Sequence, residues 1–151
     1  MKKNKLFKVR TLYEDDFSNW KTLWHKYLMF YNTSVQDIVY ETTFKRLISS
    51  QNSSQNALVA EQDNYLIGLV HYIYHPHNWK VEDVCYLQDL FVEPTMRGTG
   101  IGRALIEAVY SASDTNNTPT VYWLTQDFNK QARRLYDNIA SLTPFIKYNR
   151  H

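Results

Sequence analysis

The sequence predicts a single α+β domain over residues 1–151, built on a mixed, mainly antiparallel central sheet that is flanked by helices. Its 151 residues are the usual size of one compact domain. Hydrophobic residues make up 44% of the chain, which is enough to form a core. Helix-like and strand-like patterns follow one another in the order β-α-α-β-β-β-α-β-α-β, which is typical of helices packed on a sheet.

The N-terminal third predicts one strand and two helices. Residues 5–12 alternate loosely, as a strand does, and Asp15 or Asp16 is placed to cap the first helix. Apolar residues then recur every three or four positions, and the polar stretch 49–56 ends the second helix as a surface loop. The apolar members are Trp20, Leu23, Trp24, Tyr27, Leu28 and Tyr31 in the first helix, and Val35, Ile38, Val39, Phe44, Leu47 and Ile48 in the second.

Three strands are predicted in the middle of the chain. Residues 57–60 and 65–74 are rich in branched and aromatic side chains, and the turn-forming residues 62–64 join them as a β-hairpin. Residues 84–92 form the next strand, which ends before Pro94.

The C-terminal third predicts a helix, a strand, a second helix and a last strand. Its first helix follows a glycine-rich loop and is amphipathic. Residues 120–125 are strand-like, residues 129–140 are helical, and residues 145–148 form the last strand, which is available to pair with another chain.

Charge and composition exclude several classes of protein. A net charge of +2 argues against nucleic-acid binding, for which a basic stripe is expected. No run of 18 apolar residues is present, and the charged first fifteen residues do not resemble a signal peptide. The single Cys85 has no partner for an internal disulfide. We therefore expect a cytoplasmic protein that binds neither nucleic acid nor membrane.

Three of the four glycines, Gly98, Gly100 and Gly102, fall within five residues between a predicted strand and a predicted helix. Glycine lets backbone N–H groups approach a ligand closely, and the first turn of a helix carries free N–H groups and partial positive charge. With Arg97 and Arg103 beside them, these groups predict a phosphate or diphosphate site. A tight turn without a ligand is the alternative, but it needs only one glycine.

The spacing of this loop excludes two common phosphate-binding loops. A Walker loop needs Gly-Lys-Ser/Thr, whereas here Arg103 is followed by Ala104. The dinucleotide-binding fingerprint needs a third glycine where Arg103 stands, and a parallel sheet near the start of the chain.

The pattern Arg-x-x-Gly-x-Gly, formed by Arg97, Gly100 and Gly102, closely resembles the first signature of the GCN5-related N-acetyltransferase (GNAT) family. Residues 129–136, with the pattern Asn-x-x-Ala-x-x-Leu-Tyr, resemble the second signature. The predicted order of elements also resembles that family from end to end. Within the family, residues 70–148 look most like the Hpa2-like and polyamine acetyltransferases, whereas the N-terminal half shares only its two-helix layout.

The resemblance implies that acetyl-CoA is bound as a co-substrate. The loop N–H groups would hold its diphosphate, and the preceding strand would pair with its pantetheine arm. Asn129 would contact that arm, and Lys130 or Arg133 would reach the 3′-phosphate. The implied cofactor-binding residues are Leu90, Phe91, Val92, Arg97, Gly98, Thr99, Gly100, Ile101, Gly102, Arg103, Asn129, Lys130, Arg133 and Tyr136.

Acetyl transfer to an amine needs a proton acceptor and a proton donor. An alkylammonium, with a pKa of about 10, loses a proton before it attacks, and the departing thiolate then takes one up. Tyr136 is the candidate acid, since it ends the second signature and shares a helix face with Asn129 and Ala132. A plain core aromatic is the alternative role for Tyr136.

Two neighbouring residues are candidates for contact with the amine and for the base. Polyamine acetyltransferases have Glu where this chain has Gln88, and glutamine cannot take up a proton. We hypothesise that Asp89 attracts the cationic substrate or acts as the base. On a regular strand its side chain faces the opposite way, so a bulge would have to re-aim it. Deprotonation through water is the alternative.

Other candidates concern the acceptor pocket. Tyr27 and Tyr31, four residues apart on the first helix, would line that pocket or pack against the sheet. Trp79, with Glu82 and Asp83, would form an aromatic and acidic mouth for an amine, or a solvated loop.

No metal is expected. His71 and His75 share a strand face and His77 follows them, but no Cys or acidic residue stands at a supporting spacing. Cys85 is expected to be a buried strand residue.

The leading hypothesis is an N-acetyltransferase for a small polyamine or diamine that works as a homodimer. Alternative acceptors are an amino acid, an aminoglycoside or a lysine side chain. A non-catalytic acyl-CoA-binding regulatory module is the alternative from another class of function.

Overall fold

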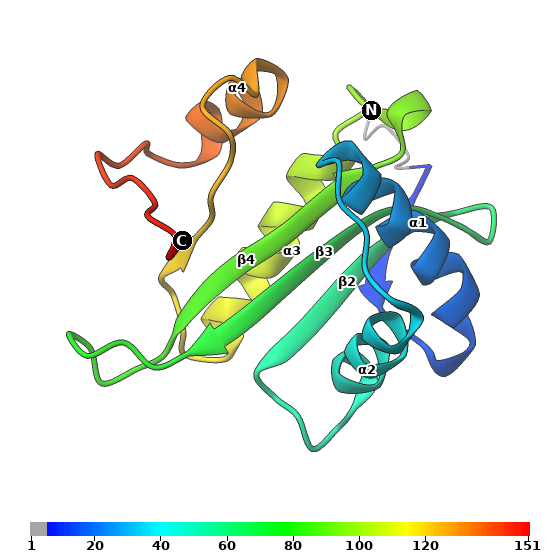
Figure 1. Ribbon diagram of the computed structural model, residues 1–151, viewed down its shortest axis with the longest axis horizontal. Coiled ribbons are helices and arrows are strands. Elements are labelled where there is room, and N and C mark those ends of the chain that lie inside the picture. The colour runs from blue at the N-terminus through cyan, green and yellow to red at the C-terminus, as the bar shows by residue number, and fades with distance from the viewer. Residues whose placement is uncertain (1–5) are drawn as a thin grey trace.

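The computed structural model describes residues 6–151, in which a five-stranded sheet carries helices on both faces (Figure 1). Neighbouring strands from the first to the fourth pair antiparallel, and the fourth pairs with the fifth in parallel. The predicted α+β fold with a mixed, mainly antiparallel sheet is therefore confirmed. In order across the sheet, the strands are β1 (Lys8–Thr11), β2 (Gln55–Gln62), β3 (Tyr65–His75), β4 (Val84–Val92) and β5 (Val121–Tyr122).

Two helices cover one face of the sheet and a third covers the other, while the fourth lies beyond β5 (Figure 1). The described chain contains α1 (Phe17–Phe30), α2 (Asp37–Ile48), α3 (Ile101–Thr115) and α4 (Lys130–Ile139), together with 3-10 turns at Glu14–Asp16 and Pro94–Met96. None of the helices within residues 6–151 has the length and apolar character needed to cross a membrane.

The sheet separates two hydrophobic clusters. On the α1–α2 face the core is largely aromatic: Trp20 stacks on Trp24 with ring centroids 5.2 Å apart, and Phe44 lies 5.2 Å from Trp20. On the α3 face the core is mainly aliphatic, because α3 buries one face formed by Ile101, Leu105, Ile106 and Val109. This is the amphipathic face that the sequence predicts.

Gly68 allows α3 to lie close to the sheet. A Cβ atom at this position would come within 3.1 Å of the side chains of Ile101 and Leu105, and within 3.3 Å of the carbonyl oxygen of Phe91. Glycine is therefore required for packing at the point where the helix that follows the glycine loop crosses β3.

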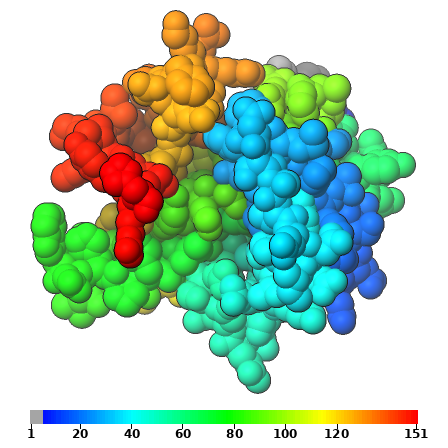
Figure 2. Space-filling model, in the orientation of Figure 1, coloured from blue at the N-terminus to red at the C-terminus, as the bar shows by residue number. Residues whose placement is uncertain are grey.

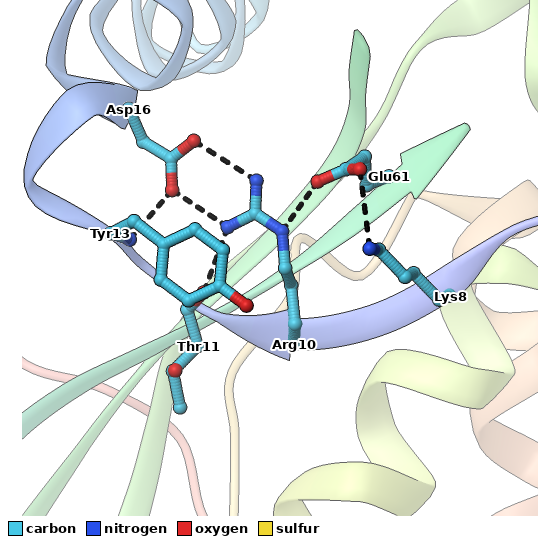
Figure 3. Close-up of polar contacts among 6 residues, drawn as sticks. All are labelled: Lys8, Arg10, Thr11, Tyr13, Asp16 and Glu61. Atoms are coloured by element: carbon cyan, nitrogen blue, oxygen red, sulfur yellow. Dashed lines mark hydrogen bonds and ion pairs between the residues drawn. The ribbon is translucent and has the colours of Figure 1, made fainter. Parts of the chain in front are cut away.

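Arg10 joins three elements at the N-terminal edge of the sheet (Figure 3). Its guanidinium donates to Asp16 at 2.7 and 3.0 Å and also to Glu61 on β2, while its Cζ lies 4.2 Å from the centroid of the Tyr13 ring. The pKa of Asp16 is lowered: burial by itself would raise it, but the hydrogen bonds from Arg10 and from the Tyr13 N–H outweigh that effect. Both carboxylates therefore stay charged around one guanidinium.

Some element boundaries differ from the prediction, and one predicted strand is wrong. β1 occupies only Lys8–Thr11 of the predicted 5–12, of which residue 5 lies outside the described residues. β5 is two residues long rather than six.

Residues 145–148 form no strand in the described structure. Phe145 and Ile146 are 83% and 77% exposed, and no neighbouring strand within residues 6–151 offers this segment a ladder of hydrogen bonds. Apolar alternation alone therefore does not make this segment a strand in the single chain.

Candidate active site

The loop between β4 and α3 has the backbone shape that the three glycines predict. Gly98 and Gly100 have positive φ values of 77° and 89°, and Gly100 is the N-cap residue of α3 in the left-handed conformation. Beyond the chain neighbours, nothing lies within 4 Å of a Cβ built on either residue. Backbone conformation, not crowding, therefore requires glycine here.

The first turn of α3 ends this loop with unpaired donors. Ala104 N–H bonds to the Gly100 carbonyl, so helical pairing starts there. No side chain of the described residues caps the preceding N–H groups at this end. Together with the partial charge of the helix N-terminus, they form a cradle of the kind that binds phosphate. The residues present therefore fit the diphosphate of a coenzyme.

A second feature of the site is the separation of β4 from β5. The two strands pair only at Cys85 with Val121 and at Tyr86 with Tyr122, counted over the described residues. Beyond Tyr86, the edge of β4 that faces β5 has no strand beside it as far as Val92 in this part of the chain. A ligand can pair with that edge as an added strand.

A cavity of about 480 Å³ joins the glycine loop, this edge of β4, the end of α1 and one side of α4. Its cations are arginines, which suit an anionic ligand. Its lining residues are Tyr27, Phe30, Tyr31, Leu90, Phe91, Val92, Arg97, Gly98, Gly100, Gly102, Arg103, Asn129, Gln131, Ala132, Arg134, Leu135, Tyr136 and Asn138. We refer to this cavity as the central groove.

The structure brings most of the predicted cofactor residues to the central groove, with four exceptions. Thr99 and Lys130 are not part of its lining, and the Ile101 side chain is buried in the α3 core. Arg133 donates to the carbonyl of Asp127 at 2.7 Å and lines a different cavity. The groove contains the next arginine in the sequence, Arg134, which the sequence analysis missed.

Arg97 is held in place from three sides. Its Cζ lies 5.5 Å from the Phe91 ring centroid and 5.7 Å from that of Phe30, and its Nε–H donates to the Val92 carbonyl at 3.1 Å. Stacking on aromatic rings orients a guanidinium without neutralising its charge. Arg97 is therefore a preorganised cation at the wall of the groove.

Tyr136 lies on the α4 side of the groove. Its ring packs edge-on against Trp123, with centroids 5.3 Å apart. Burial raises the pKa of Tyr136 to about 12, and the nearby Tyr31 adds to the shift. The hydroxyl is therefore protonated at neutral pH and able to donate a proton.

Asn129, at the start of α4, forms the helix cap. Its Oδ1 accepts from Ala132 N–H at 3.4 Å, and its Nδ2 donates to Thr125 at 3.3 Å. Asn129 therefore stabilises the local structure of the groove wall as well as lining it.

A bulge in β4 determines the direction of Asp89. His71 pairs with Asp89 and Tyr72 pairs with Leu87, so among the described residues Gln88 has no partner on β3. The extra residue reverses the alternation of β4 side chains, and Asp89 turns toward α1. Asp89 is 7% exposed, whereas Gln88 is exposed.

Asp89 lies beside the central groove among tyrosines. The pKa values of Tyr27, Tyr31 and Tyr86 are all raised, first by burial and then by the negative charge of Asp89. Tyr27 lies close enough to Asp89 for a polar contact between them to add to the rise in the pKa of Tyr27. A carboxylate surrounded by neutral phenols and aromatic faces is a suitable site for an ammonium group.

Asp89 itself is not part of the lining of the central groove, but the next residue of β4, Leu90, is. Figure 2 shows the surface of β4 in green between the α1–α2 side of the molecule and the red C-terminal segment. Tyr86 stacks on Tyr122 there, with ring centroids 5.1 Å apart, and His75 Nε2 lies 2.8 Å from the Tyr122 hydroxyl. The stacked rings of Tyr86 and Tyr122 therefore form an aromatic surface near Asp89.

Trp79, Glu82 and Asp83 lie in the loop between β3 and β4, at the opposite end of β4 from the glycine loop (Figure 1). Trp79 is 88% exposed and contacts His77. None of the three lines the central groove or the cavity that contains Arg133.

The predicted histidines lie apart. Within residues 6–151 no group of three or more His, Cys, Asp or Glu side chains is placed to hold a metal ion. His71 is buried and bonds to Trp20 and Asp89, which no sequence pattern identified. The pairing of His71 with Asp89 follows from hairpin register, and the one-residue bulge hides it from a count along the sequence.

The comparisons with known proteins agree with this geometry. A family model described as "Acetyltransferase (GNAT) family" matches residues 9–139. The chain is 38% identical over 144 residues to the D-amino-acid N-acetyltransferase HPA3 of Saccharomyces cerevisiae, which covers 95% of this chain and 89% of the relative. It is 29% identical over 76 residues to the thialysine N-epsilon-acetyltransferase of Bos taurus, and this match covers 50% of this chain and 44% of the relative.

Solved structures share the fold at low identity. The ribosomal-protein-alanine N-acetyltransferase from Brucella melitensis superposes with a TM-score of 0.80 at 20% identity, covering 96% of this chain and 98% of its own. The aminoglycoside N-acetyltransferase AAC(6')-Iy in complex with CoA has a TM-score of 0.84 at 15% identity, and the match covers 100% of this chain and 98% of that structure's chain. With a family match over most of its length, this chain belongs to the GNAT family and is an acetyl-CoA-dependent N-acetyltransferase.

Proposed function

We propose that this enzyme acetylates the primary amine of a small molecule that carries one ammonium group, with an amino acid favoured over a polyamine. The observation that carries the proposal is the buried carboxylate of Asp89 next to the central groove, since the other carboxylate that the described residues bury, Asp16, is bonded to Arg10 at the β1 edge of the sheet. The yeast relative, named as a D-amino-acid N-acetyltransferase, supports the same class of acceptor.

Acetyl-CoA is proposed to occupy the central groove. The uncapped N–H groups at the start of α3 would hold its diphosphate, with Arg97 and Arg103 adding charge. The unpaired edge of β4 at Leu90–Val92 would hold the pantetheine arm. Arg134 is the cation that we place near the 3′-phosphate, in preference to Lys130 or Arg133.

The proposed chemistry needs one acceptor and one donor of protons. The ammonium loses a proton to Asp89 or to a water molecule beside it, and the free amine attacks the thioester carbonyl carbon. A β4 N–H in the groove would stabilise the resulting oxyanion. The nitrogen loses its second proton to solvent as the carbon–sulfur bond breaks, Tyr136 gives its proton to the thiolate, and solvent restores the phenol.

Polyamines are the less favoured acceptors. A polyamine carries several ammonium groups, which several carboxylates would have to bind. The acidic residues that first supported such an acceptor, Glu82 and Asp83, lie at the far end of β4 and line neither cavity in the described chain. Among the acidic residues that residues 6–151 place, Asp89 is the one beside the groove that supports a cationic substrate.

An acceptor panel tests the proposal. Thiol release from acetyl-CoA is measured with D- and L-amino acids, a thialysine-type amino acid, spermidine and an aminoglycoside. We expect the highest kcat/KM for an amino acid. A higher kcat/KM for spermidine would contradict the preference, and coenzyme binding without turnover of any amine would contradict the catalytic proposal.

We further propose a cytoplasmic homodimer. Leu142, Phe145, Ile146 and Tyr148 are exposed along the C-terminal segment, which borders a cavity of about 990 Å³ beside β5. Contiguous exposed apolar side chains are typical of an interface. Light scattering should show a dimer for the native chain and a monomer for the Phe145→Ser, Ile146→Ser double variant. Cys85, a free and buried thiol, is compatible with a reducing compartment.

A further inference from the structure

A buried chain of hydrogen bonds runs from the aromatic core of the α1 face to Asp89. Trp20 Nε1–H donates to His71 Nε2 at 2.9 Å, and His71 Nδ1 lies 2.8 Å from Asp89 Oδ2. The three residues are 0%, 4% and 7% exposed, so water has little access to replace any of these bonds.

The chemistry of the partners fixes the position of the histidine proton. An indole N–H can only donate, so His71 Nε2 must accept and carries no hydrogen. A neutral imidazole then carries its one hydrogen on Nδ1, which donates to the Asp89 carboxylate. Trp20 thus selects the neutral Nδ1–H tautomer of His71.

The surrounding rings also fix the orientation of the imidazole. The centroid of His71 lies 5.8 Å from that of Trp20 and 5.3 Å from that of Trp24, which meets it edge-on. Rotation of the imidazole would break both of its hydrogen bonds within a packed core. Asp89 is therefore bonded through Oδ2 to a rigid donor, and Tyr27 on α1 lies close to it.

A neutral donor has a specific consequence for the charge of the site. An imidazolium beside Asp89 would cancel the negative charge that attracts an ammonium, whereas a neutral imidazole holds the carboxylate and leaves the charge in place. Tyr27 and Tyr31, which line the groove, lie close enough to Asp89 for its negative charge to add to the effect of burial in raising their pKa values.

We propose that His71, fixed by Trp20 as its neutral Nδ1–H tautomer, is a positioning residue that holds the Asp89 carboxylate in the orientation in which it receives the acceptor amine. The proposal rests on the function proposed above, in which Asp89 binds the amine. It gives a specific role to two buried residues that do not line the central groove.

Two amide variants separate positioning from packing. In His71→Asn the amide nitrogen takes the place of Nδ1 and keeps the donor to Asp89, whereas in His71→Gln the amide lies nearer the place of Nε2 and favours Trp20. We expect His71→Asn to retain kcat/KM for the acceptor within about threefold, and His71→Gln to lose about tenfold or more. The KM for acetyl-CoA should stay unchanged in both variants.

A spectroscopic measurement on the wild-type protein tests the tautomer directly. A long-range ¹H–¹⁵N correlation spectrum at neutral pH should show the His71 ring protonated at Nδ1 and unprotonated at Nε2. A ring protonated at Nε2 would overturn the inference, and so would equal loss of activity in the two amide variants.

The Asp89→Asn variant shows whether a negative result concerns the positioning role of His71 or the proposed role of Asp89. If Asp89→Asn is impaired while His71→Gln is not, the positioning role of His71 is wrong and the proposed role of Asp89 stands. If Asp89→Asn is as active as the wild type, the proposed role of Asp89 is wrong and the inference falls with it.

Discussion

At Asp89, one additional residue in β4 converts a side chain that would face α3 into one that faces α1. The same bulge leaves Gln88 exposed, so the residue without acid–base chemistry is the one in solvent. Burial is stable here because the carboxylate accepts a hydrogen bond from His71 and lies close to the phenol of Tyr27.

Replacing Asp89 by Asn keeps the shape of the side chain and removes its charge. Since that charge is proposed to attract and deprotonate the ammonium, we expect kcat/KM for the amine to fall by about 10- to 100-fold. Steady-state kinetics with varied amine measures the change. Asp83→Asn, in the loop at the far end of β4, is the matched control and should behave as the wild type. An equal effect of both variants would contradict the assignment.

Replacing Tyr136 by Phe removes the proposed proton donor and leaves the ring. We expect kcat to fall by about 100-fold while the Kd for acetyl-CoA stays constant, because the lost interaction belongs to the chemical step. Tyr65→Phe, at the exposed first residue of β3, is the control. A parallel loss of coenzyme affinity would instead indicate a binding role.

The pH dependence of kcat gives a second test of Tyr136. Its pKa is raised to about 12, so the phenol keeps its proton well above neutral pH. We expect no alkaline decline of kcat from this group up to about pH 10. A decline near pH 8 that is absent from Tyr136→Phe would contradict the shift.

Among the elements, the turn between β4 and α3 depends most on backbone conformation. Gly100 has a φ of 89°, which a side chain disfavours by about 1–2 kcal/mol although the space around it is open. In Gly100→Ala we expect a modest loss of thermal stability and a larger loss of acetyl-CoA affinity, because the N–H groups of the loop move. Calorimetric titration measures the affinity, and an unchanged Kd would contradict the diphosphate cradle.

The edge formed by β1 and β2 is held by ionic contacts. The pKa values of Asp16 and Glu61 are both lowered in the folded chain, and for Glu61 the hydrogen bond from Arg10 is the main cause. A lowered carboxyl pKa stabilises the fold above the unfolded pKa of about 4, and that stability is lost as pH falls through the folded pKa.

Arg10→Gln tests this edge. We expect the melting temperature to fall by roughly 3–6 °C at pH 7, with the difference from the wild type shrinking below about pH 4 as the carboxyls become protonated. Thermal unfolding of the wild type and the variant, followed by circular dichroism at pH 7 and below about pH 4, measures the difference in melting temperature at each pH. The same difference at both pH values would contradict this and show that Arg10 stabilises the fold through packing alone.

At the scale of the whole molecule, the sequence predicted the elements that bury a periodic face. The apolar spacing in α1 and α3 identified these helices and their buried faces, and the glycine spacing identified the loop before α3. In α2 the spacing identified the helix but not its buried face, because Ile38, Val39 and Ile48 are exposed and Tyr40 is buried with Phe44. The strand predicted at residues 145–148 is wrong because a strand needs a partner, which local alternation cannot supply. The His71–Asp89 bond was invisible because it depends on a bulge between distant residues.

The arrangement of the two cavities also emerges only at this scale. The central groove exists because β4 and β5 part after two pairs, so that α4 faces α1 across a gap. The second cavity lies on the other side of α4, beside the C-terminal segment. Arg133 and Arg134, adjacent in sequence, consequently line different cavities.

A crystal structure with CoA bound tests the central claim most directly, because the two cavities offer the coenzyme different places. We predict its diphosphate on the N–H groups between positions 97 and 103, and its sulfur between Tyr136 and Asp89. A coenzyme seated in the cavity beside the C-terminal segment, with the glycine loop empty, would contradict the assignment of the active site.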